Sequence, residues 1–367
     1  MVKERNWGID LLRLLSMGMV MLLHILGHGG IHTTAVRFSA QYEISRFLET
    51  AAICAVNVYA LISGYVGVHA RHRFSGLISL WLQVVTYSVG LTALIGWLLP
   101  GTVTAETLKH AFFPVTYQQY WYFTAYFAVF FFTPFLNHLL NTLPRRKLQL
   151  LLLSLVFLFS LLPTLGNRDV FRTGNGFSAL WLAALYLIGG YCRQFEVFRN
   201  RSAYKALGVY LACVLIAWGS RWILESRWLF EDHDLPGNYL VRYTSPTILL
   251  CAVALLALFA GLRVPEGLVR IVRVLAPLSF GVYLIHEQPL IRTHVIIDRF
   301  KDYASYSPPL MVGAILGTVC GLFLLCCAIE WLRARLFRLL HLPTLCEKAE
   351  QGLRRVCAWI GTRMTRT

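Results

Sequence analysis

The first segment of the chain combines a histidine and an arginine in a spacing that could do chemistry. Residues 7–24 are largely apolar but carry three ionisable side chains, Asp10, Arg13 and His24. In a helix, Arg13 and His24 are separated by roughly 16 Å along the axis and about 20° around it, so they share one face. Asp10 is three residues before Arg13 and can neutralise it. Because a charge that faces lipid costs a few kcal/mol, this face is expected to point into protein or water.

A second histidine with a neighbouring carboxylate occurs late in the chain. His286 and Glu287 follow the apolar run that begins at Ser279. Imidazole titrates near neutral pH, so two histidines at a similar depth suit proton transfer, and His24, His286, Arg13 and Asp10 are the candidate catalytic residues. Two structural readings stay open: a polar residue at the headgroup boundary, and a helix that simply ends at Pro289.

Histidines also recur at every fourth residue from His24 through His28 to His32, which is a spacing for metal ligands on one helical face. Glycines between Gly27 and Gly30 indicate that the helix breaks within this run. We therefore expect no metal.

Four residues are candidates for substrate binding: Glu49, Tyr120, Trp121 and Glu287. Glu49 lies in the outer part of the second apolar segment, above Asn57, and both could pair with the first helix or simply link helices by hydrogen bonds. The aromatic residues could stack on a sugar or form an interfacial aromatic belt.

The elements that must position these residues are membrane helices. The chain has 367 residues, of which 57% are hydrophobic and 14% charged, and its apolar runs reach the length that spans a bilayer. We predict an all-α polytopic bundle with both termini in the cytoplasm, in one membrane domain of residues 1–332 and a basic amphipathic tail of residues 333–367. Ten spans are expected, at residues 9–27, 45–68, 76–98, 119–140, 148–163, 178–193, 204–224, 243–261, 274–292 and 310–332.

The distribution of charge supports this topology. The net charge of +16 comes from short basic clusters between apolar runs, which does not fit a nucleic-acid surface and points to membrane lipids as partners. Loops on the side of the termini carry about twice as many Lys and Arg residues as loops on the other side. By the positive-inside rule, Arg13 is then near the cytoplasmic face and His24 near the outer face.

The order of several motifs resembles the acyltransferase 3 family of integral membrane acyltransferases. The first motif is the Arg-x10-His arrangement from Arg13 to His24. The others are the run from Ile62 to Tyr65, Tyr120-Trp-Tyr-Phe, and the run from Ser279 to His286. Where the family often has Arg-x-x-Arg after the second span, this chain has Arg71-His-Arg73.

The resemblance implies a multi-pass enzyme of the cell inner (plasma) membrane. Such an enzyme moves an acetyl or other short acyl group from cytoplasmic acyl-CoA to a hydroxyl of a surface glycan or a lipid-linked sugar. Arg13 and His24 are then the essential pair, with acetyl-CoA as the donor. Arg13, Arg71 and Arg73 are expected to hold its phosphates, because guanidinium groups bind phosphate well.

Two questions stay open at the level of sequence. A transporter or flippase of a glycan-lipid or small acid could use the same buried ionisable residues as a proton pathway. The acceptor, and whether the protein forms a homo-oligomer, are not specified by any motif.

Overall fold

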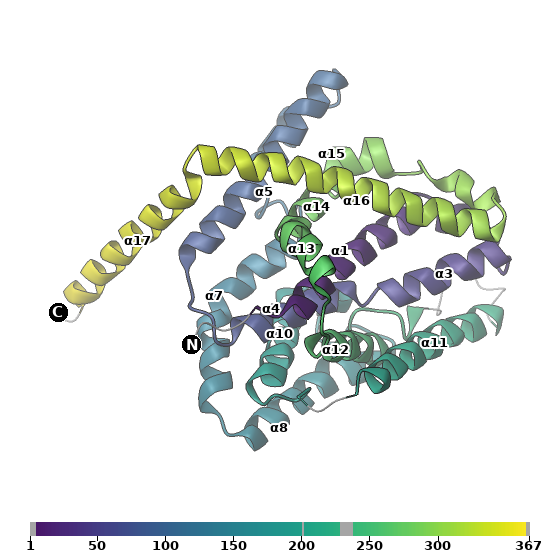
Figure 1. Ribbon diagram of the computed structural model, residues 1–367, viewed down its shortest axis with the longest axis horizontal. Coiled ribbons are helices and arrows are strands. Elements are labelled where there is room, and N and C mark those ends of the chain that lie inside the picture. The colour runs from purple at the N-terminus through teal and green to yellow at the C-terminus, as the bar shows by residue number, and fades with distance from the viewer. Residues whose placement is uncertain (1–4, 200–201, 228–237, 365–367) are drawn as a thin grey trace.

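The computed structural model describes residues 5–199, 202–227 and 238–364, with side chains up to residue 355. Within these ranges the regular elements are all helices, as expected, and none is a strand. They form a bundle in which α16 runs along one edge and α11 along another, with α1 near the middle (Figure 1). The longer helices are α1 (Trp7–Gly27), α3 (Ala40–Ala52), α4 (Ala55–Gly67), α5 (Phe74–Leu98), α7 (Trp121–Thr142), α8 (Arg145–Val156), α10 (Ala179–Gln194), α11 (Ala203–Arg227), α12 (Pro246–Ala260), α13 (Glu266–Leu275), α14 (Ser279–His286), α16 (Pro308–Leu339) and α17 (Leu342–Met364). The shorter elements are α2 (Ile31–Thr34), α6 (Ala105–Phe112), η1 (Phe157–Leu161), α9 (Leu162–Gly166), η2 (Gly174–Gly176), η4 (Ala276–Leu278), α15 (Pro289–Ile291), η5 (Arg292–Ile296) and η6 (Lys301–Ser305).

Helical segments of the described chain coincide with the expected spans, although not all are long enough to cross a bilayer. Eight segments have the length and apolar character to span a membrane. They are Trp7–Thr34, Ala40–Gly67, Phe74–Leu98, Trp121–Thr142, Arg145–Gly166, Ala203–Arg227, Glu266–His286 and Pro308–Leu339. The other two expected spans correspond to α10 and α12, which have only 16 and 15 residues. The count of ten and the side on which the termini lie stay predictions.

The central position of α1 follows from its two faces of apolar side chains. It packs against α4 and α12 on one side and against α14 and α16 on another. Leu12, Met21 and Leu26 are fully buried in these contacts. The Asn6 side chain caps the start of the helix by accepting a hydrogen bond from the Ile9 amide. The ionisable residues of α1 therefore face protein, as their cost in lipid requires.

Two glycines allow α4 and α10 to approach closely. A Cβ atom added at Gly64 would lie 1.9 Å from the Tyr186 carbonyl oxygen, and one added at Gly189 would lie 2.0 Å from the Leu61 carbonyl oxygen. Each backbone thus occupies the space that a side chain would need. Gly64 lies in the run from Ile62 to Tyr65, so this motif serves close helix packing.

The C-terminal region differs from the expected tail in where it begins. The last bundle helix, α16, continues without a break to Leu339, so residues 333–339 belong to it. The separate helix α17 leaves the bundle beyond this point (Figure 1). Its Glu350 carboxylate accepts a hydrogen bond of 3.0 Å from the Ser75 amide, so α17 packs against the start of α5.

Candidate active site

Two histidines from distant parts of the chain meet at the end of α1. Nδ1 of His24 lies 2.8 Å from Nε2 of His286, and the two ring centroids are 5.0 Å apart. Helix α14 ends at His286, which is 3% exposed. The two histidines that the sequence placed at a similar depth are therefore in contact.

The hydrogen bonds of His286 determine where the protons of the pair lie. Nδ1 of His286 is 2.6 Å from the Val282 carbonyl oxygen, which can only accept a hydrogen bond. When both rings are neutral, His286 therefore carries its proton on Nδ1 and accepts at Nε2. His24 must then donate from Nδ1, which leaves its Nε2 without a proton. A ring nitrogen in that state can act as a base.

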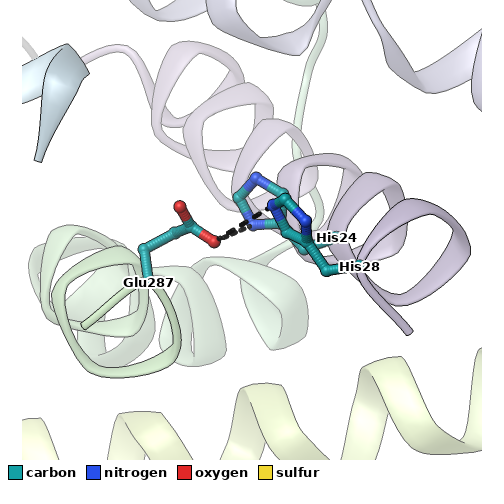
Figure 2. A group of neighbouring side chains, drawn as sticks. All are labelled: His24, His28 and Glu287. Atoms are coloured by element: carbon teal, nitrogen blue, oxygen red, sulfur yellow. Dashed lines mark ion pairs between the residues drawn. The ribbon is translucent and has the colours of Figure 1, made fainter. Parts of the chain in front are cut away.

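Glu287 lies beside His24 and His28 (Figure 2). Its Oε1 atom is 3.2 Å from Nδ1 of His24 and 3.8 Å from Nε2 of His28. The other carboxylate oxygen accepts a hydrogen bond of 3.3 Å from Arg292. Oε1 itself is buried and accepts no hydrogen bond. A buried carboxylate at this distance favours the protonated form of a neighbouring imidazole.

His24 lines a small, mainly apolar cavity that is enclosed by aromatic rings. The cavity has a volume of about 40 Å³ and is bounded by Met17, Val20, Leu23, His24, Val56, Tyr59, Trp121, Tyr122, Tyr243, Phe280 and Tyr283. The Tyr283 hydroxyl has no hydrogen-bond partner although it is buried, so its proton is available to a ligand.

Arg13 lies at a second and larger cavity, about 440 Å³ in volume. Its Nη1 atom donates to Asp10 Oδ1 at 2.6 Å, and Arg5 donates to the other oxygen of that carboxylate. The predicted pairing of Asp10 with Arg13 is therefore confirmed, and the Asp10 carboxylate is buried. Arg193 from α10 also lines this cavity, where it donates a hydrogen bond to the Tyr65 hydroxyl, so three guanidinium groups line the cavity.

The two cavities meet the same side of α1. The Tyr59 hydroxyl donates a hydrogen bond of 2.8 Å to the Arg13 carbonyl oxygen, while the Tyr59 ring lines the cavity of His24. The arrangement that the spacing of Arg13 and His24 predicted is therefore the one observed.

Comparison with known proteins identifies a family. A family model described as an acyltransferase domain, that of the acyltransferase 3 family, matches residues 6–327, a range that includes Arg13 and His24. The chain belongs to the acyltransferase 3 family. No curated protein and no solved structure matches the sequence.

In this acyltransferase 3 family member, only one of the three arginines that the sequence suggested for phosphate binding, Arg13, lines the larger cavity. Arg71 and Arg73 lie in the loop after α4, are exposed, and do not line the cavity. Arg5 and Arg193 do. Arg193 carried no local signal in the sequence, because it lies at the end of a buried helix whose position depends on packing with α4.

The candidate substrate residues of the family member divide between the cavity and the core. Trp121 lines the His24 cavity and contacts Phe177 at a centroid distance of 4.5 Å. Tyr120 is 1% exposed and donates to the Leu284 carbonyl oxygen, so its ring supports the core and is closed to a sugar. Glu287 contacts the histidines, as described above.

Glu49 belongs to a separate polar group. Its Oε2 atom accepts hydrogen bonds from Arg46 at 3.1 Å and Arg221 at 2.7 Å. It also lines a pocket of about 180 Å³ that shares Tyr243 with the His24 cavity. His32 lies 3.6 Å from Glu49 and has therefore left the face that carries His24 and His28.

Asn57 does not pair with the first helix. It donates to the Tyr243 carbonyl oxygen at 2.7 Å and accepts from the Trp181 indole at 3.1 Å. The alternative reading, hydrogen bonding between helices, is the one observed. Tyr243, which this bond positions, was missed from the sequence, since it lies in an irregular stretch with no motif. By contrast, Tyr122, Phe280 and Tyr283 lie inside motifs that the sequence analysis had noted.

Proposed function

We propose that this protein transfers an acetyl group from acyl-CoA to a hydroxyl of a surface glycan or its lipid-linked precursor. The proposal depends on one observation: His24, with Nε2 free to accept a proton, lines a cavity whose aromatic wall reaches Arg13. The acyltransferase 3 family supports the reaction class. The arginines of the larger cavity support the donor, and the acceptor is the one that the resemblance to the family implies.

The larger cavity suits the phosphates of coenzyme A. Arg5, Arg13 and Arg193 line it, and guanidinium groups bind phosphate oxygens through two parallel hydrogen bonds. Asp10 holds Arg5 and Arg13 in place. The expected topology puts this cavity at the cytoplasmic side, where acyl-CoA is made.

The smaller cavity suits a short acyl group. Its volume is about 40 Å³, and one water molecule needs roughly 10–15 Å³ by the same measure. An acetyl group fits such a space, whereas a long acyl chain does not. The aromatic lining excludes water and so protects the thioester from hydrolysis.

The chemistry is acyl transfer with His24 as general base. Nε2 of His24 accepts the proton of the acceptor hydroxyl while the oxygen attacks the thioester carbonyl carbon. The carbon–sulfur bond breaks, the electron pair leaves with the sulfur of CoA, and an ester forms. Glu287 stabilises the imidazolium of His24, and His286 holds its ring in the required orientation. The unpaired Tyr283 hydroxyl is a donor for the oxyanion that develops on the carbonyl oxygen.

Mass spectrometry of surface glycans tests the function. Cells that express the protein should carry glycans heavier by the mass of one acetyl group at the modified sugars, and cells without the gene should lack this addition. Mild alkali should remove the added mass, because it hydrolyses an ester. Identical glycan spectra with and without the gene, under conditions in which the protein is present in the membrane, would contradict the proposal.

A further inference from the structure

The C-terminal end of α1 holds two imidazoles and a carboxylate in the arrangement of a metal site. His24 and His28 are four residues apart, and the amide of His28 donates to the His24 carbonyl oxygen, so the helical geometry extends to His28. Both rings therefore lie on one face, with Glu287 opposite them (Figure 2). One ligand atom from each of the three residues lies within 4.8 Å of the other two.

The distances within this group agree with tetrahedral coordination. Zinc binds imidazole nitrogen and carboxylate oxygen at about 2.0–2.2 Å, so its tetrahedral ligands are roughly 3.3 Å apart. The observed separations from Glu287 Oε1 are 3.2 Å to His24 Nδ1 and 3.8 Å to His28 Nε2. Two of the three ligand separations are therefore close to those of a tetrahedral site, and all three are within 4.8 Å.

The state of Glu287 is a second and independent indication of a ligand. The residue is 6% exposed, and its Oε1 atom accepts no hydrogen bond. A buried carboxylate oxygen without a donor is costly, and a cation satisfies it. The other oxygen is held by Arg292, which is the kind of outer contact that orients a metal-binding carboxylate. The His28 side chain is 42% exposed, so an ion can reach the group from outside.

We propose that His24 Nδ1, His28 Nε2 and Glu287 Oε1 bind Zn²⁺, with water as the fourth ligand. This departs from the expectation of no metal, which assumed that the glycines break the helix before a second histidine could join the first. The break comes after His28, so two histidines stay together and only His32 turns away. The donor set of two imidazoles and one carboxylate is one that zinc uses with an open position.

Zinc in this site inhibits acyl transfer, a consequence that rests on the proposed function. Nδ1 of His24 cannot bind zinc and donate to His286 at the same time. When the metal occupies Nδ1, the single proton of the neutral ring moves to Nε2 through solvent, with no net release. Nε2 then no longer accepts a proton from the acceptor hydroxyl. The metal and the base thus compete for one ring.

Zinc binding is tested first, by calorimetry on the full chain in detergent after removal of metal with a chelator. We expect one Zn²⁺ per chain and no binding of Mg²⁺, which prefers oxygen ligands. His28→Ala should weaken zinc binding by about tenfold or more, because it removes one of three ligands. His138→Ala is the matched control: His138 is exposed on α7, about 26 Å along that helix from Trp121, and its replacement should leave binding unchanged. Equal zinc affinity in His28→Ala and the wild type would overturn the site.

Acyl transfer from acetyl-CoA then tests inhibition. Zinc should lower transfer by the wild type and by His138→Ala, and His28→Ala should keep its activity at the same zinc concentration. Equal inhibition of His28→Ala, or loss of wild-type activity when zinc is removed, would contradict the inhibitory role. If zinc binds as expected but no variant transfers an acetyl group in any condition, the proposed function fails and the metal site stands.

Discussion

At the scale of single residues, the proposed reaction depends on which nitrogen of His24 carries a proton. The Val282 carbonyl oxygen fixes the proton of His286 on Nδ1, and His286 in turn fixes the proton of His24 on Nδ1. His286 acts through these two hydrogen bonds and does not need to touch the substrate. His286 is therefore a positioning residue for the proposed base.

Replacing His286 should change the tautomer of His24 together with the rate. In His286→Ala, Nδ1 of His24 loses its acceptor at 2.8 Å and keeps only the Glu287 carboxylate, 3.2 Å away, so the turnover rate should fall by about 10- to 100-fold. Nitrogen-15 spectra should show His24 protonated on Nδ1 in the wild type and a mixture of tautomers in the variant. His286→Gln, whose side-chain oxygen can accept the hydrogen bond, should recover part of the rate. An unchanged His24 spectrum in His286→Ala would contradict the proposed chain of hydrogen bonds.

The Tyr283 hydroxyl should contribute to the rate and little to folding. Tyr283→Phe removes only an oxygen that has no partner, so the turnover rate should fall by about 10²- to 10³-fold, as for loss of one oxyanion donor. Thermal unfolding should be almost unchanged. Tyr210→Phe is the control: it removes a hydroxyl that donates to the Ala51 carbonyl oxygen and should cost about 1 kcal/mol of stability with no loss of rate. If Tyr283→Phe keeps the wild-type turnover rate, the Tyr283 hydroxyl is not an oxyanion donor.

At the scale of elements, the close approach of α4 and α10 holds the walls of both cavities. Tyr59 and Arg193 lie on these two helices, one at each cavity. Gly64→Ala places a methyl group 1.9 Å from the Tyr186 carbonyl oxygen, and the helices must separate, at a cost of about 1–3 kcal/mol. Gly90→Ala, with open space around the added atom, should be neutral or slightly stabilising. Thermal unfolding in detergent measures the stability of both variants. Equal midpoints for the two variants would contradict the close packing of α4 and α10.

The attachment of α17 to α5 should depend on pH. Hydrogen bonds from Ser75 and Arg354 lower the pKa of Glu350 from its ordinary value to about 2. Because the pKa is lower when the helix is attached, the carboxylate stabilises attachment fully above the ordinary pKa near 4.5 and loses this effect as pH falls toward 2. The distance between spin labels on α5 and α17 should therefore increase below pH 4.5. Glu350→Gln should remove this pH dependence, and an identical acid transition in that variant would show that another group is responsible.

Part of this architecture was predictable from the sequence because it depends on local spacing. The face shared by Arg13 and His24 follows from helical periodicity, and the pairing with Asp10 follows from a separation of three residues. The contact of His286 with His24 depends on how α14 packs on α1, which no local pattern specifies. For the same reason Arg193 and Tyr243 were missed, and Arg71 and Arg73 were expected at a cavity that they do not line.

At the scale of the whole molecule, the bundle separates a basic cavity from an aromatic one along a single helix. In the proposed function, the length of α1 between Arg13 and His24, roughly 16 Å, lets the donor bind by its phosphates at one cavity and present its thioester at the other. The helices α10 and α12 have only 16 and 15 residues, and many of their side chains are buried in the core of the bundle. Their assignment as spans stays a prediction, because their hydropathy is typical both of a spanning helix and of a helix buried in protein.

The most direct test is transfer across a sealed membrane. Proteoliposomes are loaded with acetyl-CoA labelled in its acetyl group, and washed surface glycan is added outside. For chains whose Arg13 end faces the lumen, the account predicts labelled ester on the external glycan with wild-type protein, and none with His24→Gln at equal reconstitution. External glycan labelled equally by His24→Gln and the wild type would contradict the central claim that this imidazole is the base for acyl transfer.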